Sequence, residues 1–69
     1  MKRDRFLSRL RRYCRKHDFA YEVDQARGKR SHITVFVGDR RTVVKSGELT
    51  PGYVALLLKQ LRLPPDALE

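Results

Sequence analysis

The sequence predicts a single α+β domain with the element order α-β-β-β-α, in which two helices pack on one face of a three-stranded antiparallel sheet. Near both ends of the chain, apolar residues recur at three- and four-residue spacing, which is typical of amphipathic helices. In the middle they alternate with polar residues, which is typical of half-buried strands. A chain of 69 residues has room for one domain, and we expect its folded core to run from about residue 4 to residue 63.

The first helix is expected over residues 4–17. Asp4 is the expected N-cap, because it would place a carboxylate at the positive end of the helix. The last turn is basic and complements the negative end, where we expect His17 to be half-buried. The apolar stripe of this helix comprises Phe6, Leu7, Leu10, Tyr13, Cys14 and His17, and the opposite side carries Arg5, Arg9, Arg12 and Lys16.

Three strands are expected in the middle of the chain, over residues 19–24, 32–37 and 41–45. A basic loop at residues 26–30 separates the first two, and Gly38-Asp39 forms a tight turn between the last two. One face of the sheet is expected to be covered by the helices and the other to be open. Tyr21, Ile33, Val35 and Val37 are expected to face the helices, whereas Glu22, Asp24, His32, Thr34, Phe36 and Val44 are expected on or beside the open face.

The second helix is expected to begin at Thr50-Pro51, with Thr50 as N-cap and Pro51 at the first helical position. Its apolar stripe consists of Val54, Leu57, Leu58 and Leu61. Pro64-Pro65 cannot continue a helix, so we expect it to stop there and residues 66–69 to form a frayed tail.

The chain is strongly basic, with 16 Lys and Arg against 8 Asp and Glu and a formal net charge of +8. Residues 1–45 contain 14 of the basic residues and only 5 of the acidic ones. This asymmetry favours a partner that carries phosphates, such as RNA or DNA, although an anionic membrane surface or an acidic protein would also be attracted.

The apolar pattern and the cysteine count of the sequence argue against several classes of protein. The longest apolar run, residues 53–58, is far too short for a membrane-spanning helix, and no apolar signal-peptide core follows the charged N-terminus. Cys14 is the single cysteine and cannot form an intramolecular disulfide. We therefore expect a cytoplasmic protein.

His32 is the candidate catalytic residue, because it follows a basic, glycine-containing loop at the start of a strand. Cleavage of RNA removes a proton from the ribose 2′-hydroxyl and returns one to the leaving 5′-oxygen, and imidazole can do either near neutral pH. Arg27, Lys29 and Arg30 would offset the charge that develops on the phosphoryl oxygens. Gly28 would let the backbone approach a phosphate closely.

Other chemistry has little support in the sequence. Cys14 and His17 share a helix face, but two ligands do not complete a zinc site, and we expect neither a metal nor a cofactor. A lone histidine in a loop, such as His32, is most often simply exposed and has no chemical role. A non-catalytic RNA-binding module of the same fold is therefore the alternative to a nuclease, and one half of a tight protein complex is a third possibility.

Two motifs, together with the element order, resemble those of a known family. The segments are Gly28-Lys29-Arg30-Ser31-His32, and Gly47-Glu48-Leu49-Thr50-Pro51-Gly52 followed by Leu58-Lys59-Gln60-Leu61. On these residues the chain resembles the HicA-like, or YcfA-like, mRNA interferase toxins of toxin–antitoxin pairs. The resemblance covers roughly residues 5–65. It departs from the family pattern at Arg30, where a glycine is usual, and in the segment Val43-Val44-Lys45 at the end of the third strand, where a Val-Pro is common.

The resemblance implies a fold similar to double-stranded-RNA-binding domains and a metal-independent endoribonuclease. It implies that His32 is catalytic, that the partner is a HicB-like antitoxin covering the active surface, and that the target is mRNA. Ser31 would position the scissile group. The sequence does not identify the second proton-transfer group, and Glu22 and Asp24 are candidates only if the register of the strands brings them near His32.

Overall fold

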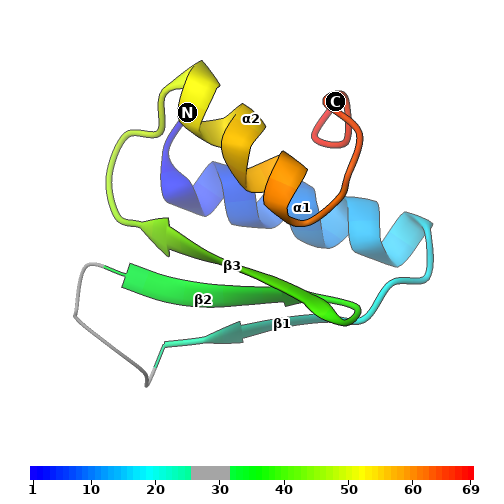
Figure 1. Cartoon of the computed structure of the whole chain (residues 1–69). Helices are drawn as coiled ribbons and strands as arrows, with labels where there is room; N and C mark the ends of the chain where they lie inside the picture. The colour runs from blue at the N-terminus through cyan, green and yellow to red at the C-terminus, as the bar shows by residue number, and fades with distance from the viewer. Residues whose placement is uncertain (26–31) are drawn as a thin grey trace.

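The computed structural model describes residues 1–25 and 32–69 and has the predicted order of elements (Figure 1). Three strands form one antiparallel sheet in the order β1-β2-β3, and both helices lie on the same side of it. The predicted α+β fold class is confirmed. The elements are α1 (Arg3–Lys16), β1 (Tyr21–Asp24), β2 (His32–Val37), β3 (Arg40–Lys45) and α2 (Pro51–Gln60).

The register of the sheet separates a covered face from an open one. Ile33, Val35 and Val37 of β2 are buried beneath the helices, as predicted. Thr42 and Val44 pair with Val35 and Ile33 and therefore share this covered face. The placement of Val44 on the open face was thus wrong: it is fully buried, and its neighbour Val43 takes the outward position.

One hydrophobic core fills the space between the sheet and the helices. Leu57 of α2 is almost wholly buried, and α2 lies closest to β3. Across this contact, the Thr42 hydroxyl donates a hydrogen bond to the Gln60 side-chain oxygen, which satisfies the one polar side chain found among the buried described residues. The core comprises Phe6, Leu10, Cys14, Ile33, Val35, Val37, Val44, Leu49, Leu57, Leu58, Leu61, Leu63, Ala67 and Leu68.

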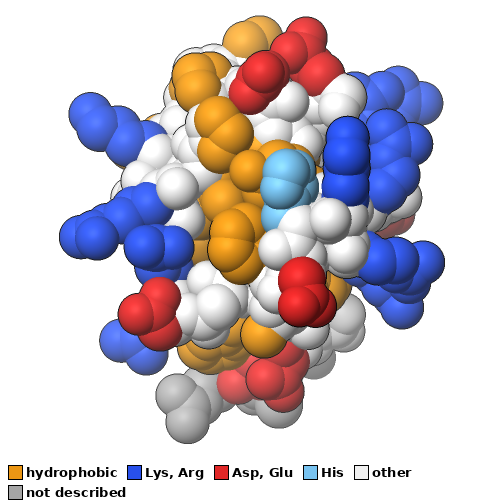
Figure 2. All heavy atoms as spheres, turned by 90° about the vertical axis from the view of Figure 1, so that its right-hand side faces the viewer, with side chains coloured by type: hydrophobic (Ala, Val, Ile, Leu, Met, Phe, Trp, Pro, Cys, Tyr) orange, Lys and Arg blue, Asp and Glu red, His pale blue; other side chains and the backbone are white. Residues whose placement is uncertain are grey.

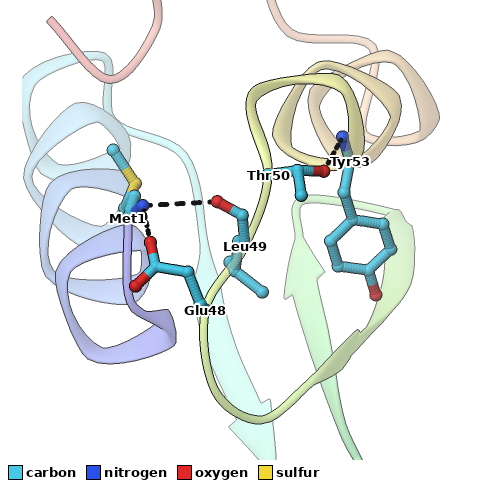
Figure 3. Close-up of polar contacts among 5 residues, drawn as sticks. All are labelled: Met1, Glu48, Leu49, Thr50 and Tyr53. Atoms are coloured by element: carbon cyan, nitrogen blue, oxygen red, sulfur yellow. Dashed lines mark hydrogen bonds and ion pairs between the residues drawn. The ribbon is translucent and has the colours of Figure 1, made fainter.

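The beginnings of the two helices are built differently. At α2, the Thr50 hydroxyl accepts a hydrogen bond from the Tyr53 backbone N–H at 3.2 Å, so the predicted N-cap is confirmed (Figure 3). At α1, the N-cap is Lys2 and Asp4 lies inside the first turn, so the prediction of Asp4 as N-cap was wrong. The Asp4 carboxylate still lies at the positive end of the helix dipole.

The first residues of the chain are held by the segment before α2. The Arg3 N–H donates to the Gly47 carbonyl at 3.1 Å, and the Leu49 N–H donates to the Met1 carbonyl at 2.7 Å. The N-terminal ammonium group contacts the Glu48 carboxylate and the Leu49 carbonyl (Figure 3). The hydrogen bond from this ammonium, and then its charge, lower the pKa of the exposed Glu48 carboxyl.

Both helices end in a Schellman motif without glycine. After α1, the Phe19 N–H donates to the Cys14 carbonyl at 2.8 Å, and Asp18 has a left-handed φ of 59°. After α2, the Leu63 N–H donates to the Leu58 carbonyl at 2.9 Å around a left-handed residue 62. Because the backbone at residues 18 and 19 serves the helix end, β1 begins at residue 21 and not at the predicted residue 19.

The C-terminal segment packs against the domain, and the expectation of a frayed tail was wrong. Leu63, Ala67 and Leu68 are buried in the hydrophobic core. The Ala67 N–H donates to the Pro64 carbonyl at 3.0 Å, which turns the chain back after the two prolines (Figure 1). Within the residues that the structure describes, no helix is both long and apolar enough to cross a membrane.

Candidate nucleic-acid interface

His32 is the first residue of β2 and lies exposed on the open face of the sheet, as predicted. Its register partner on β3 is Lys45, so the two side chains project from the same face. The predicted strand faces are therefore confirmed for β2. The open-face residues are Glu22 and Asp24 on β1, His32, Thr34 and Phe36 on β2, and Arg41, Val43 and Lys45 on β3.

The open face is electrostatically divided. Its β1 side carries two carboxylates, and its β3 side carries the cations of Arg41 and Lys45. Asp24 pairs with Thr34, which places it diagonally from His32, about 7–8 Å away for residues in that relation. Glu22 pairs with Phe36, one row further along the sheet. The register therefore makes Asp24 the nearer of the two carboxylates that the sequence offered.

Lys45 and Tyr53 form a contact that the sequence pattern does not predict. The Lys45 ammonium lies 5.0 Å from the centroid of the Tyr53 ring, within the range of a cation–π interaction. The Tyr53 hydroxyl accepts a hydrogen bond from the Lys45 N–H at 3.2 Å and donates one to the Val43 carbonyl at 3.3 Å. Tyr53 thus fixes the end of β3 that lies opposite His32.

A groove of about 520 Å³ runs along the outer edge of β3, between the open face of the sheet and α2. Arg41 is the one charged residue among the described residues that line it. Thr34, two residues from His32 on the same face, also contributes to its wall, so the groove adjoins the candidate catalytic residue. The groove is lined by Thr34, Phe36, Arg41, Thr42, Val43, Tyr53, Leu56, Leu57 and Gln60.

The proposed phosphate-binding residues lie outside the described part of the chain. They are Arg27, Gly28, Lys29, Arg30 and Ser31, which immediately precede β2 in sequence. Of the predicted site, the structure therefore describes His32 and the two carboxylates of β1.

The polar side of α1 forms a basic surface. Arg5, Arg9, Arg12 and Lys16 are all exposed, at the spacing predicted for the polar side of the helix. Figure 2 looks onto the side of the molecule on the right of Figure 1, where Lys and Arg side chains gather on both sides of a central band of hydrophobic side chains. The exposed cations of α1 add to the positive potential that would attract a polyanion.

His17 differs from its prediction, because it is exposed instead of half-buried. Its ring lies 4.2 Å from that of Tyr13 and 6.3 Å from that of Phe19, centroid to centroid. The contact between Tyr13 and Phe19 is the apolar contact that commonly accompanies a Schellman motif. This histidine therefore belongs to the end of α1, remote in sequence from the face that carries His32.

The described residues contain no group of three or more His, Cys, Asp and Glu side chains placed to hold a metal ion. Cys14 is buried, and burial raises the pKa of its thiol above the usual value. A thiol that is both buried and protonated is a poor nucleophile.

Comparison with known proteins gives no relative. No protein-family model, no curated protein and no solved structure matches the chain significantly.

Proposed function

We propose that this protein is a metal-independent endoribonuclease of the HicA-like mRNA interferase type, with His32 as its general acid or base. The observation that carries the proposal is the exposed position of His32 on the open face, directly opposite Lys45. An accessible imidazole can exchange protons with a substrate, and an adjacent cation can stabilise charge that develops on a phosphoryl group.

The proposed reaction is transesterification within the RNA chain. The 2′-hydroxyl loses its proton to a base, the 2′-oxygen attacks phosphorus, and the bond from phosphorus to the 5′-oxygen breaks as that oxygen receives a proton. The products carry a 2′,3′-cyclic phosphate and a 5′-hydroxyl. His32 performs one of the proton transfers, and Asp24 is the candidate for orienting it or for sharing the other.

The basic segment before β2 supplies the remaining groups. In this proposal Arg27, Lys29 and Arg30 bind the phosphates that flank the scissile bond, Gly28 allows close approach, and Ser31 positions the scissile group. The charge of these residues and the position of the segment directly before His32 support these roles. The sequence resemblance further suggests mRNA as the target and a HicB-like antitoxin as the protein that restrains the activity, and we propose the cytoplasm as the location.

The proposal is tested by incubating a long single-stranded RNA with the purified protein in excess EDTA. We expect cleavage that persists in the chelator and products that end in 2′,3′-cyclic phosphate. Cleavage that appears only when a divalent cation is added would contradict the mechanism, and so would products that carry a 5′-phosphate.

A non-catalytic RNA-binding module is the second candidate, and the exposed cations of α1 favour it. Both functions predict RNA binding that weakens as salt concentration rises, because bound cations are released from the phosphates. The two functions differ in one respect: RNA that is bound tightly and recovered intact would support the binding module.

A further inference from the structure

We infer that the outer edge of β3 docks an acidic, extended segment of a protein partner, which adds a strand to the sheet. β3 is an edge strand, with β2 on one side. The two Tyr53 hydrogen bonds show that the Val43 carbonyl and the Lys45 N–H point away from β2. By the alternation of an antiparallel ladder, the N–H and carbonyl of Arg41 and the N–H of Val43 point the same way.

This edge is only partly covered. In the described part of the chain, Tyr53 is the side chain that forms hydrogen bonds with this edge. Tyr53 reaches only the C-terminal half of β3. No other described residue bonds the backbone groups of Arg41 or the Val43 N–H, so they are available to another partner. An unpaired strand edge of this kind is a template for an additional strand.

The surface beside the edge is apolar. Val43 and Leu56 are 51% and 48% exposed, and both line the same groove. Among the described residues, the one other large hydrophobic side chain that is exposed to a comparable degree is Phe19. A strand added to β3 would place every second side chain over this groove, so apolar residues at alternate positions would fill it.

The charges select the chemistry of the occupant. Arg41 lines the groove and the Lys45 ammonium lies against Tyr53 of its wall, whereas no carboxylate is found among the described residues that line it. A second copy of this chain would bring its own Arg41 and Lys45 to the same edge, and its net charge of +8 would oppose association. An acidic segment is attracted by the same cations.

The exposed groups also favour a polypeptide over RNA. The edge presents both donors and the Arg41 carbonyl, an acceptor, and a peptide backbone can satisfy both kinds. Phosphates only accept hydrogen bonds. In addition, the most exposed side chains of the groove are the aliphatic Val43 and Leu56, whereas RNA bases stack on aromatic faces.

A strand added here would pair with β3, which would lie between it and His32 on β2. The groove that it would fill reaches Thr34, two residues from His32 on the same face, so the occupant would lie beside the candidate site. That the partner acts as an inhibitor rests on the proposed function, whereas the docking itself does not require that His32 be catalytic.

The test is an NMR titration of the full chain carrying His32→Ala, so that binding is measured apart from cleavage. The probe is a capped hexapeptide of alternating Glu and Val. We expect amide shifts centred on Arg41 and Val43, together with slowed exchange of their N–H groups. Val43→Glu and Leu56→Glu should each weaken binding about tenfold or more, whereas Phe19→Glu, which changes an exposed hydrophobic outside the groove, should not.

Three outcomes would overturn the inference. Equal binding of a peptide with Lys in place of Glu would show that the cations of the edge do not select an acidic segment. Equal binding of a peptide whose backbone nitrogens are methylated at alternate positions would exclude strand addition. If oligouridine shifted the Arg41 and Val43 amides while the acidic peptide did not, the groove would be an RNA surface instead. None of these outcomes decides whether the wild-type chain cleaves RNA.

Discussion

His32 on β2 and Lys45 on β3 are register partners on the open face of the sheet. The tight turn at Gly38-Asp39, after which Arg40 pairs with Val37, sets this relationship. Tyr53 then holds Lys45 from the side of α2. The candidate site therefore consists of a histidine next to a positioned cation, beside the groove that follows the edge of β3.

Replacing Lys45 tests whether this cation takes part in the proposed reaction. We expect Lys45→Met to lower the rate of RNA cleavage at least about tenfold, because a positive charge beside the reacting phosphate would be lost. Lys45→Arg should retain much more activity. Lys59→Met, which removes an exposed cation from α2, is the matched control. Equal rates for the Lys45→Met and Lys59→Met variants would show that Lys45 is not part of the site.

The two Schellman motifs predict where the domain can be stabilised. Asp18 and Arg62 adopt φ values of 59° and 55°, a region in which a β-carbon costs about 1 kcal/mol. We expect Asp18→Gly and Arg62→Gly each to raise the free energy of unfolding by about 0.5–1 kcal/mol, measured by urea denaturation. The corresponding alanine variants should be no more stable than wild type. A loss of stability in both glycine variants would contradict the assignment.

The packed C-terminal segment predicts a cost for truncating its side chains. Leu68 is 6% exposed and belongs to the main core. We expect Leu68→Ala to lower the free energy of unfolding by about 2–3 kcal/mol, as for other buried leucines. Glu69→Ala, at the exposed neighbouring position, should change it little. A neutral Leu68→Ala variant would restore the original expectation of a frayed tail.

Burial of two ionisable groups predicts weaker stability in alkali. Burial raises the pKa of the Cys14 thiol, and burial followed by the Cys14 charge raises that of Tyr21, against a smaller opposing effect of Arg11. The unfolded chain therefore loses these protons at lower pH than the folded protein does. The stabilisation is complete below about pH 8.5 and is lost as pH rises through the raised values.

This dependence is measured by urea denaturation between neutral pH and about pH 10. The fall in stability should be shallower in Cys14→Ala than in wild type, although the variant starts from a lower value because a buried group is removed. A stability that is independent of pH in wild type would contradict the assigned burial of both groups.

Much of the fold could be predicted from the sequence, because local patterns and tertiary packing agree. The alternation of Ile33, Val35 and Val37 identified the bounds and the covered face of β2, and Thr50 identified the start of α2. The Val44 error came from a shift of one residue in a short strand. It could have been avoided, since a two-residue turn at Gly38-Asp39 fixes the register of β3.

Other features depend on contacts that no local pattern encodes. The sequence from Pro64 onward is short and polar at intervals, yet Ala67 and Leu68 join the hydrophobic core, and the segment lies against the end of α1. The hydrogen bonds between Tyr53 and the edge of β3 form because α2 approaches β3, although a loop separates the two elements in sequence. His32 was identified from its own neighbourhood in the sequence, whereas Lys45 emerged only from the pairing of strands.

The measurement that tests the central claim most directly compares the two histidines of the chain. Both His32 and His17 are exposed; His32 begins β2, whereas His17 is the C-cap of α1. The rate of RNA cleavage in EDTA is measured for His32→Ala and His17→Ala, with folding of each verified by circular dichroism. We expect His32→Ala to lose at least about a hundredfold in rate and His17→Ala to cut like wild type. Folded variants that cut RNA at the same rate would contradict the assignment of His32 as the catalytic residue.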